Sequence, residues 1–444
     1  MSQKTNYGQT LMHLLNGYIG SGILAMPRAF ADGGLIIACI GTPIFAVLMN
    51  YCILLLVWIN AHLCRELGSQ PMDYEDVAEK VLLNGPKPLK RFAKTARYIV
   101  MTFLVISQVG GCSVYNVFIA DNLKIFLIRV NSDQNTTAPA LIGANYDGFW
   151  SMSIEYYLLI ILPILVVLTY VRNIRTLSIA SLLANLLQVV ALCMLLYNLL
   201  RDIPDPVTIH TVPVGNKIPF FFTTSVFAFE VVKVAIPLYK NMEKPEQMSQ
   251  TFGVLNVAIV IVLAFYFTIG FLGYVKYGSS VEASLTLSLP AEILYYCVQF
   301  IYAVAVVLTY PILLFGAIEM LWPLIDKRLI DNKASYCKRE ISNYLFRTLM
   351  VLLTFAFAAL IPELELIISL FAAISMSFIA IIFPPILHLL TFSSQKQSRF
   401  TFIWMNAMNG ILIVFGLIGF GFGTYYSISD IINEFSKEDI HIEG

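Results

Sequence analysis

Long apolar stretches, separated by short polar ones, constrain this chain more than any other feature of its sequence. A membrane-spanning helix needs about 20 mostly apolar residues to cross a hydrocarbon core about 30 Å thick. Eleven stretches meet or approach this length, and they cover residues 10–30, 35–63, 98–128, 154–170, 177–199, 218–238, 251–275, 291–321, 344–361, 366–391 and 401–427. We therefore predict an all-α membrane protein with about eleven transmembrane helices.

Composition supports a lipid environment and excludes several other partners. Of the 444 residues, 58% are hydrophobic and 13% are charged, whereas soluble domains carry about 25% charged residues. The formal net charge is zero, and no stretch forms the basic face that binding to nucleic acid requires. The expected partner is the lipid bilayer.

The distribution of basic residues predicts the orientation. If residues 1–9 are a short cytoplasmic tail, twenty of the 28 lysines and arginines lie in segments on the cytoplasmic side, as the positive-inside rule requires. Residues 10–427 then form the transmembrane domain, and residues 428–444 a short extracellular or lumenal tail. The sequon at Asn135 falls in a loop expected outside, which predicts glycosylation of that side chain.

Motifs of catalysis and cofactor binding are missing from the sequence. There is no nucleophile elbow, phosphate loop, dinucleotide fingerprint or His-Glu-x-x-His pair, and the five histidines lack the spacing of metal ligands. The seven cysteines fall mostly in apolar stretches, where they are expected to be small buried side chains. We expect no enzyme, no cofactor and no metal site.

The first apolar stretch is unusually rich in residues that weaken a helix. It contains Gly17, Gly20, Gly22 and Pro27, and glycine and proline both disfavour a continuous helix. Unwound backbone at membrane depth is tolerated where it lines a cavity or is buried in protein, and such breaks mark the binding sites of transporters. Close helix packing through small residues is the alternative.

The sixth stretch carries an acid and a base, Glu230 and Lys233, at mid-membrane depth. Charges inside a membrane are costly and are functional by default, although a structural ion pair is the alternative. The two unusual helices are five helices apart. Inverted repeats of five helices place the binding site at their two broken first helices.

The chain resembles the amino acid/auxin permease family, and in particular its proton-coupled amino acid transporter branch. The resemblance runs over most of the chain and rests on many short motifs in order. They lie at residues 11–15, 20–27, 111–115, 120–124, 227–230, 237–238, 242–247, 273–278, 285–290, 361–366 and 383–385.

This resemblance implies a five-plus-five inverted repeat with broken helices one and six, and one additional helix. It implies alternating access, with small neutral amino acids and protons as partners. The substrate carboxylate would bind the backbone N–H groups near Gly20, Ser21 and Gly22, which agrees with the preference of a helix N-terminus for anions.

Further site residues are expected in the first and sixth helices. Ser225, Phe227 and Phe229 would line or gate the substrate pocket. The first-helix histidine of the branch is linked to proton coupling and matches His13. Glu230 is the second titratable candidate, and Lys233 accompanies it.

Several positions depart from the family pattern. Asn16 and Tyr18 replace a lysine and an asparagine, and Arg28 stands where an acid is common. The motif Gly-Ile-Gly that usually follows the acid of helix six is replaced by residues 231–233, Val-Val-Lys. The missing glycines predict that the helix stays wound here, so that Glu230 and Lys233 share one face and pair.

Three functions remain open at this stage. The first is a proton-linked carrier of small neutral amino acids; the second is an amino acid sensor that binds ligand with little transport. The third is a carrier without ion coupling, in which Lys233 supplies a permanent positive charge. A channel is disfavoured because no ring of charge or filter-like repeat is visible. Plasma membrane and lysosomal membrane both fit the sequence.

Overall fold

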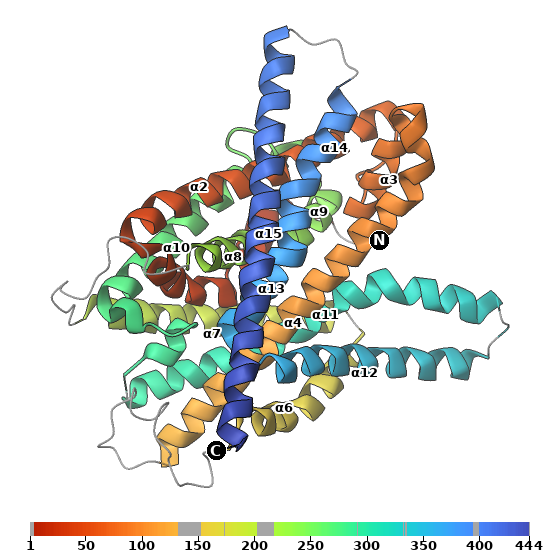
Figure 1. Cartoon of the computed structure of the whole chain (residues 1–444). Coiled ribbons are helices and arrows are strands. Elements are labelled where there is room, and N and C mark those ends of the chain that lie inside the picture. Colours follow the sequence, from red (N-terminus) through yellow and green to blue (C-terminus); the bar gives the residue numbers. More distant parts are fainter. Residues whose placement is uncertain are drawn as a thin grey trace. The chain divides into compact units, whose positions relative to one another are not determined.

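The computed structural model describes residues 4–131, 152–172, 174–201, 217–290, 292–331, 333, 335–393 and 399–443. The predicted glycosylation site, Asn135, lies outside these residues. The chain forms two compact units. Unit one comprises Met1–Leu104, Thr211–Thr268 and Ser369–Gly444, and unit two comprises Val105–His210 and Ile269–Ile368. Figure 1 labels most of the helices of both units and colours them along the chain.

The described residues are almost entirely helical, as predicted. The α-helices are α1 (Tyr7–Tyr18), α2 (Ser21–Leu67), α3 (Tyr74–Asn84), α4 (Ala93–Asn131), α6 (Ile154–Thr169), α7 (Ile174–Leu200), α8 (Ile218–Phe229), α9 (Val232–Asn241), α10 (Val254–Tyr277), α11 (Ile293–Asp331), α12 (Tyr336–Leu360), α13 (Leu364–Phe371), α14 (Phe383–Phe392) and α15 (Arg399–Glu443). Among these residues, strand geometry is limited to one isolated bridge between Thr5 and Met242.

Nine helical segments in the described part of the chain are long and apolar enough to cross a membrane. The chain is therefore a multi-pass membrane protein, while the number eleven remains a prediction. The second predicted stretch is continuous with the first in α2, which bends at Gly34 with φ 68° and ψ 160°. A positive φ is accessible to glycine without steric cost, so the bend separates two spans without a loop.

Unit one is built around the contact between α2 and α8. Within this unit, α1 also packs on α9, and α14 and α15 pack on each other. Aromatic rings join three of these helices, since the ring of Phe45 lies 5.4 Å from that of Phe222 and 5.7 Å from that of Phe415, centroid to centroid. Such edge-on and tilted pairs add specificity to apolar packing, and they fix α8 between α2 and α15.

Between α13 and α14 the helix of unit one widens into two π-helical turns, Ala372–Met376 and Phe378–Ile382. The Ser377 hydroxyl donates to the carbonyl oxygen of Ala372, five residues earlier, at 3.0 Å. Turns of this kind are frequent at functional sites. The sequence did not predict them, because no residue type marks a π turn.

Unit two contains two helix pairs, α7 with α11 and α6 with α12. Its interior holds polar side chains that bond to one another. The Asn116 amide donates to the Thr354 hydroxyl at 3.2 Å, and the Tyr310 hydroxyl lies 2.6 Å from the same atom. Large apolar residues such as Val189 and Leu345 are exposed on this unit, as side chains that face lipid would be.

Candidate functional site

Two helices of unit one are interrupted, at the positions expected for helices one and six. The helix α1 ends at Tyr18 and α2 begins at Ser21, with Gly20 at φ −142° and ψ −149°. The helix α8 ends at Phe229 and α9 begins at Val232. The structure thus contains both breaks that the resemblance implied.

The expectation that the sixth helix stays wound was wrong. Glu230 has φ −76° and ψ 116°, and Val231 has φ −136° and ψ 9°. Both residues keep a negative φ, which any L-residue adopts. Glycine is therefore not required to open this helix, and its absence from the sequence was a misleading signal.

The two breaks lie against each other, with the helices running in opposite directions. A Cβ placed on Gly22 would lie 2.9 Å from the Cα of Ala228, and one on Gly33 would lie 3.0 Å from the ring of Phe221. Residue numbers rise along α2 as they fall along α8, so the two helices are antiparallel. Gly17 of α1 faces the side chain of Val231 in the same way.

Four helix ends meet at this place. The N-termini of α2 and α9 present backbone N–H groups and positive partial charge, whereas the C-termini of α1 and α8 present carbonyl oxygens and negative partial charge. No side chain caps the first turn of α2 from its N-cap residue, Gly20. The arrangement can hold one group of each sign side by side.

Glu230 and Lys233 form a buried ion pair at the second break. The Lys233 ammonium lies 2.8 Å from Oε2 of Glu230, and the two side chains are 12% and 1% exposed. The other carboxylate oxygen of Glu230 accepts from the backbone N–H of Lys233 at 3.4 Å. The predicted pair is present, but it forms at the start of α9 rather than along a continuous helix.

The other predicted site residues occupy different surroundings. Ser21 and Gly22 are buried, and Gly20 is half-buried. Ser225 is buried on α8, and within the described residues its hydroxyl has no hydrogen-bond partner. His13 is exposed on α1. The structure thus brings the glycine segment and Glu230 together, while His13 lies more than one turn before the break.

The aromatic residues around the second break differ in burial. Phe227 is half-buried, whereas Phe229 is fully buried. The Phe229 ring packs on the ring of Tyr266 from α10, with 5.1 Å between the centroids. Tyr18, which the sequence marked only as a departure from the family pattern, has a buried hydroxyl without a partner among the described residues.

The helix α8 is held in place by a row of buried hydroxyl groups. The Thr223 and Ser369 hydroxyl oxygens are 2.9 Å apart, and those of Ser369 and Ser427 are 2.7 Å apart. Close contact with α15 adds to this, since a Cβ on Gly419 would overlap the ring of Phe222. These contacts hold α8 in place, and Phe229 is the last residue of this helix.

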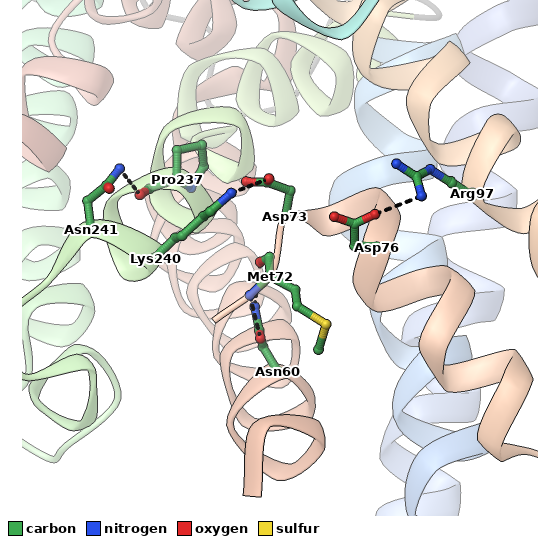
Figure 2. Close-up of polar contacts among 8 residues, drawn as sticks. All are labelled: Asn60, Met72, Asp73, Asp76, Arg97, Pro237, Lys240 and Asn241. Carbon is green, nitrogen blue, oxygen red and sulfur yellow. Dashed lines mark hydrogen bonds and ion pairs between the residues drawn. The ribbon is translucent and has the colours of Figure 1, made fainter. Parts of the chain in front are cut away.

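At the end of α9, polar contacts join four segments of unit one (Figure 2). Lys240 donates to a carboxylate oxygen of Asp73 at 2.5 Å. The Asn60 amide bonds both backbone groups of Met72, donating at 2.8 Å and accepting at 3.1 Å. No sequence pattern predicted these contacts, because each joins a helical residue, Lys240 of α9 or Asn60 of α2, to the segment before α3.

Two further contacts lie away from the breaks, one between α1 and α9 and one between α2 and the start of α8. The backbone of Thr5 bonds Asn241 at 2.9 Å and Glu243 at 3.0 Å, which ties the start of α1 to the end of α9. Lys217, before α8, lies 3.8 Å from a carboxylate oxygen of Asp32 in α2. The pair α1 and α9 and the pair α2 and α8 are therefore each joined by a contact remote from the breaks.

Comparison with known proteins gives these features a context. The family described as "Transmembrane amino acid transporter protein" matches residues 3–429. The "Proton-coupled amino acid transporter-like protein pathetic" of Drosophila melanogaster is 29% identical, over 98% of this chain and 87% of that protein. The "Probable amino acid transporter skat-1" of Caenorhabditis elegans is 25% identical, over 97% and 91%.

Among solved structures, the crystal structure of MhsT in complex with L-phenylalanine matches with a TM-score of 0.48 and 12% identity. That match covers 93% of this chain and 98% of MhsT. A manganese transporter of Eremococcus coleocola, solved with an aromatic bis-isothiourea substituted compound, matches with a TM-score of 0.46 and 11% identity, over 96% and 91% of the two chains.

Proposed function

Because the chain belongs to the family of transmembrane amino acid transporter proteins, we propose that it carries small neutral amino acids across a membrane by alternating access. The site of binding is the place in unit one where the two broken helices meet. Plasma membrane and lysosomal membrane are both compatible with this role.

The observation that carries the proposal is the antiparallel contact of the two breaks. The N-terminus of α2, at Ser21 and Gly22, follows a glycine that has no side chain to cap it, and it offers backbone N–H groups to a carboxylate. The carbonyl ends of α1 and α8 lie beside it and attract an ammonium group. An amino acid zwitterion carries both groups on one carbon atom and matches this pattern.

Charge and space at the breaks favour a small, neutral side chain. Glu230 and Lys233 neutralise each other at 2.8 Å, so the pair leaves no net charge to attract a charged side chain. The approach of Gly22 to the backbone of Ala228 restricts the room beside the carboxylate site. Ser225, Phe227 and Phe229 are the proposed lining residues.

A weak link to protons is part of the proposal. Glu230 and His13 are the titratable candidates. The Lys233 ammonium lies 2.8 Å from the Glu230 carboxylate and balances its charge, so the pair needs no transported proton for neutrality. We therefore expect weaker proton coupling than in relatives with glycines at this position, or none. Full pH dependence of uptake in a transport-competent His13→Gln variant would remove His13 from the proposal.

A sensor that binds amino acids with little transport is the rival function. Both functions require the binding site, so binding alone does not separate them. We would measure thermal stabilisation of the purified protein by glycine, alanine, proline, phenylalanine, lysine and glutamate, and uptake of the same amino acids into proteoliposomes.

The proposal predicts stabilisation and saturable uptake with the three small neutral amino acids, and neither with lysine or glutamate. Stabilisation without uptake would favour the sensor. No stabilisation by any of the six amino acids would contradict both functions.

A further inference from the structure

One side chain touches the backbone of both broken helices. Tyr266 of α10 is fully buried, and its hydroxyl donates to the carbonyl oxygen of Tyr18 at 2.5 Å and lies 3.1 Å from that of Ala228. Tyr18 is the last residue of α1, and Ala228 is the next to last residue of α8. A single phenol therefore spans the two breaks.

The two carbonyl groups need such a donor. The last four carbonyls of a helix lack an intrahelical N–H partner, and a buried carbonyl without a hydrogen bond destabilises the fold. The break after Tyr18 and the break after Phe229 leave carbonyls of this kind within the protein interior. Tyr266 supplies a hydrogen bond at the point where α1 and α8 end.

The ring of Tyr266 packs on Phe229, the last residue of α8. Ring and hydroxyl thus have separate roles, because the ring contact would persist if the hydroxyl were removed. The phenol has one proton for two acceptors, so it cannot saturate both carbonyls at once. Acceptor capacity remains at the breaks for the N–H groups of a ligand.

We propose that Tyr266 is a positioning residue, whose hydroxyl holds the two breaks in register and thereby sets the affinity for substrate. The effect on affinity rests on the function proposed above, whereas the effect on the breaks does not. In this role Tyr266 acts through the backbone of Tyr18 and Ala228.

The test uses Tyr266→Phe, which keeps the ring, and a matched control, Tyr74→Phe. Tyr74 also donates from a buried phenol to a backbone carbonyl, that of Ile379, at 2.9 Å. Both variants lose one bond of the same kind in unit one. Only Tyr266→Phe loses it at the breaks.

The first readout is hydrogen–deuterium exchange of the full-length protein. Tyr266→Phe should accelerate exchange in the segments around Gly20 and Val231 by about fivefold, the factor that one hydrogen bond of typical net strength gives. Tyr74→Phe should leave these segments unchanged. Unchanged exchange at both breaks in Tyr266→Phe would overturn the proposal, whether or not the protein transports amino acids.

The second readout is the kinetics of alanine uptake, normalised to folded protein. Tyr266→Phe should raise KM about fivefold with Vmax nearly unchanged, since one hydrogen bond is lost at the site. A lower Vmax at unchanged KM would indicate a merely structural residue and would overturn the positioning role. If the unmodified protein takes up no alanine, the proposed function fails, and the exchange measurement still decides whether Tyr266 holds the breaks.

Discussion

Both breaks in unit one interrupt a helix, but the residues that form them differ. The break between α1 and α2 comprises Ile19 and Gly20 and is followed by the small residues Ser21 and Gly22, and the N-cap residue, Gly20, has no side chain to cap α2. The break between α8 and α9 has no glycine, and Glu230 and Lys233 form an ion pair across the start of α9. Close approach to Ala228 thus requires a glycine after the first break, whereas the second break opens without glycine and carries an ion pair.

The largest effect is expected at Gly22, where the first break contacts the backbone of the second. A side chain there would force the two breaks apart, because the nearest atom to its Cβ is a backbone atom of Ala228 at 2.9 Å. Gly22→Val should abolish amino acid binding, and overpacking of this kind destabilises a fold by about 1–3 kcal/mol. Equilibrium binding to the purified variant measures this.

Gly410 provides the control, since a Cβ on it meets no atom within 4 Å. Gly410→Ala should bind amino acids as the unmodified protein does, whereas Gly22→Ala should already weaken binding. Unchanged affinity in Gly22→Val would show that the breaks do not form the binding site.

Loss of a charge at the second break should affect amino acid binding less than Gly22→Val does, but it should affect stability more. Loss of one member of a buried ion pair costs about 3–5 kcal/mol, because the other charge is left uncompensated. Glu230→Gln and Lys233→Met should each lower the thermal stability, and the double variant should lose less than the sum of the two.

The double-mutant cycle would be scored by the melting temperature and by amino acid binding. Coupling is expected between residues in direct contact, and these two groups are 2.8 Å apart. Additive effects of the two substitutions would contradict the view that the pair supports the second break.

The sequence predicted one break better than the other. Glycines and Pro27 marked the first break, since their backbone effects are local. At the second, the same reasoning predicted a wound helix around Lys233 and failed, because Glu230 and Val231 leave the helix with ordinary negative φ values. The charges of Glu230 and Lys233 marked the second break better than its glycine content did.

Most of the fold could be predicted from the lengths of the hydrophobic stretches, but several contacts at the site could not. Tyr266 lies in an apolar stretch and contacts Tyr18, 248 residues away in sequence. Lys240 and Asp73 are 167 residues apart. Contacts over such separations depend on how the helices pack, and no pattern within a single segment of sequence reports them.

The smallest effect on amino acid binding is expected when a glycine is introduced into the second break. Val231 has φ −136°, which valine adopts without strain, and its side chain is 1% exposed. Val231→Gly should therefore leave binding affinity nearly unchanged and lower stability by about 1.5–3 kcal/mol, the value of burying such a side chain. A gain in affinity would show that the missing glycine does limit this site.

The central claim is that the second break contains a charge pair and no glycine, and that the Lys233 ammonium balances the charge of the Glu230 carboxylate. The most direct measurement is the initial rate of alanine uptake into proteoliposomes by the unmodified protein, with and without an inward proton gradient at equal internal pH. The account predicts uptake that the gradient leaves nearly unchanged, because the Lys233 ammonium already balances the charge of the Glu230 carboxylate. Uptake that depends strongly on the gradient would contradict it.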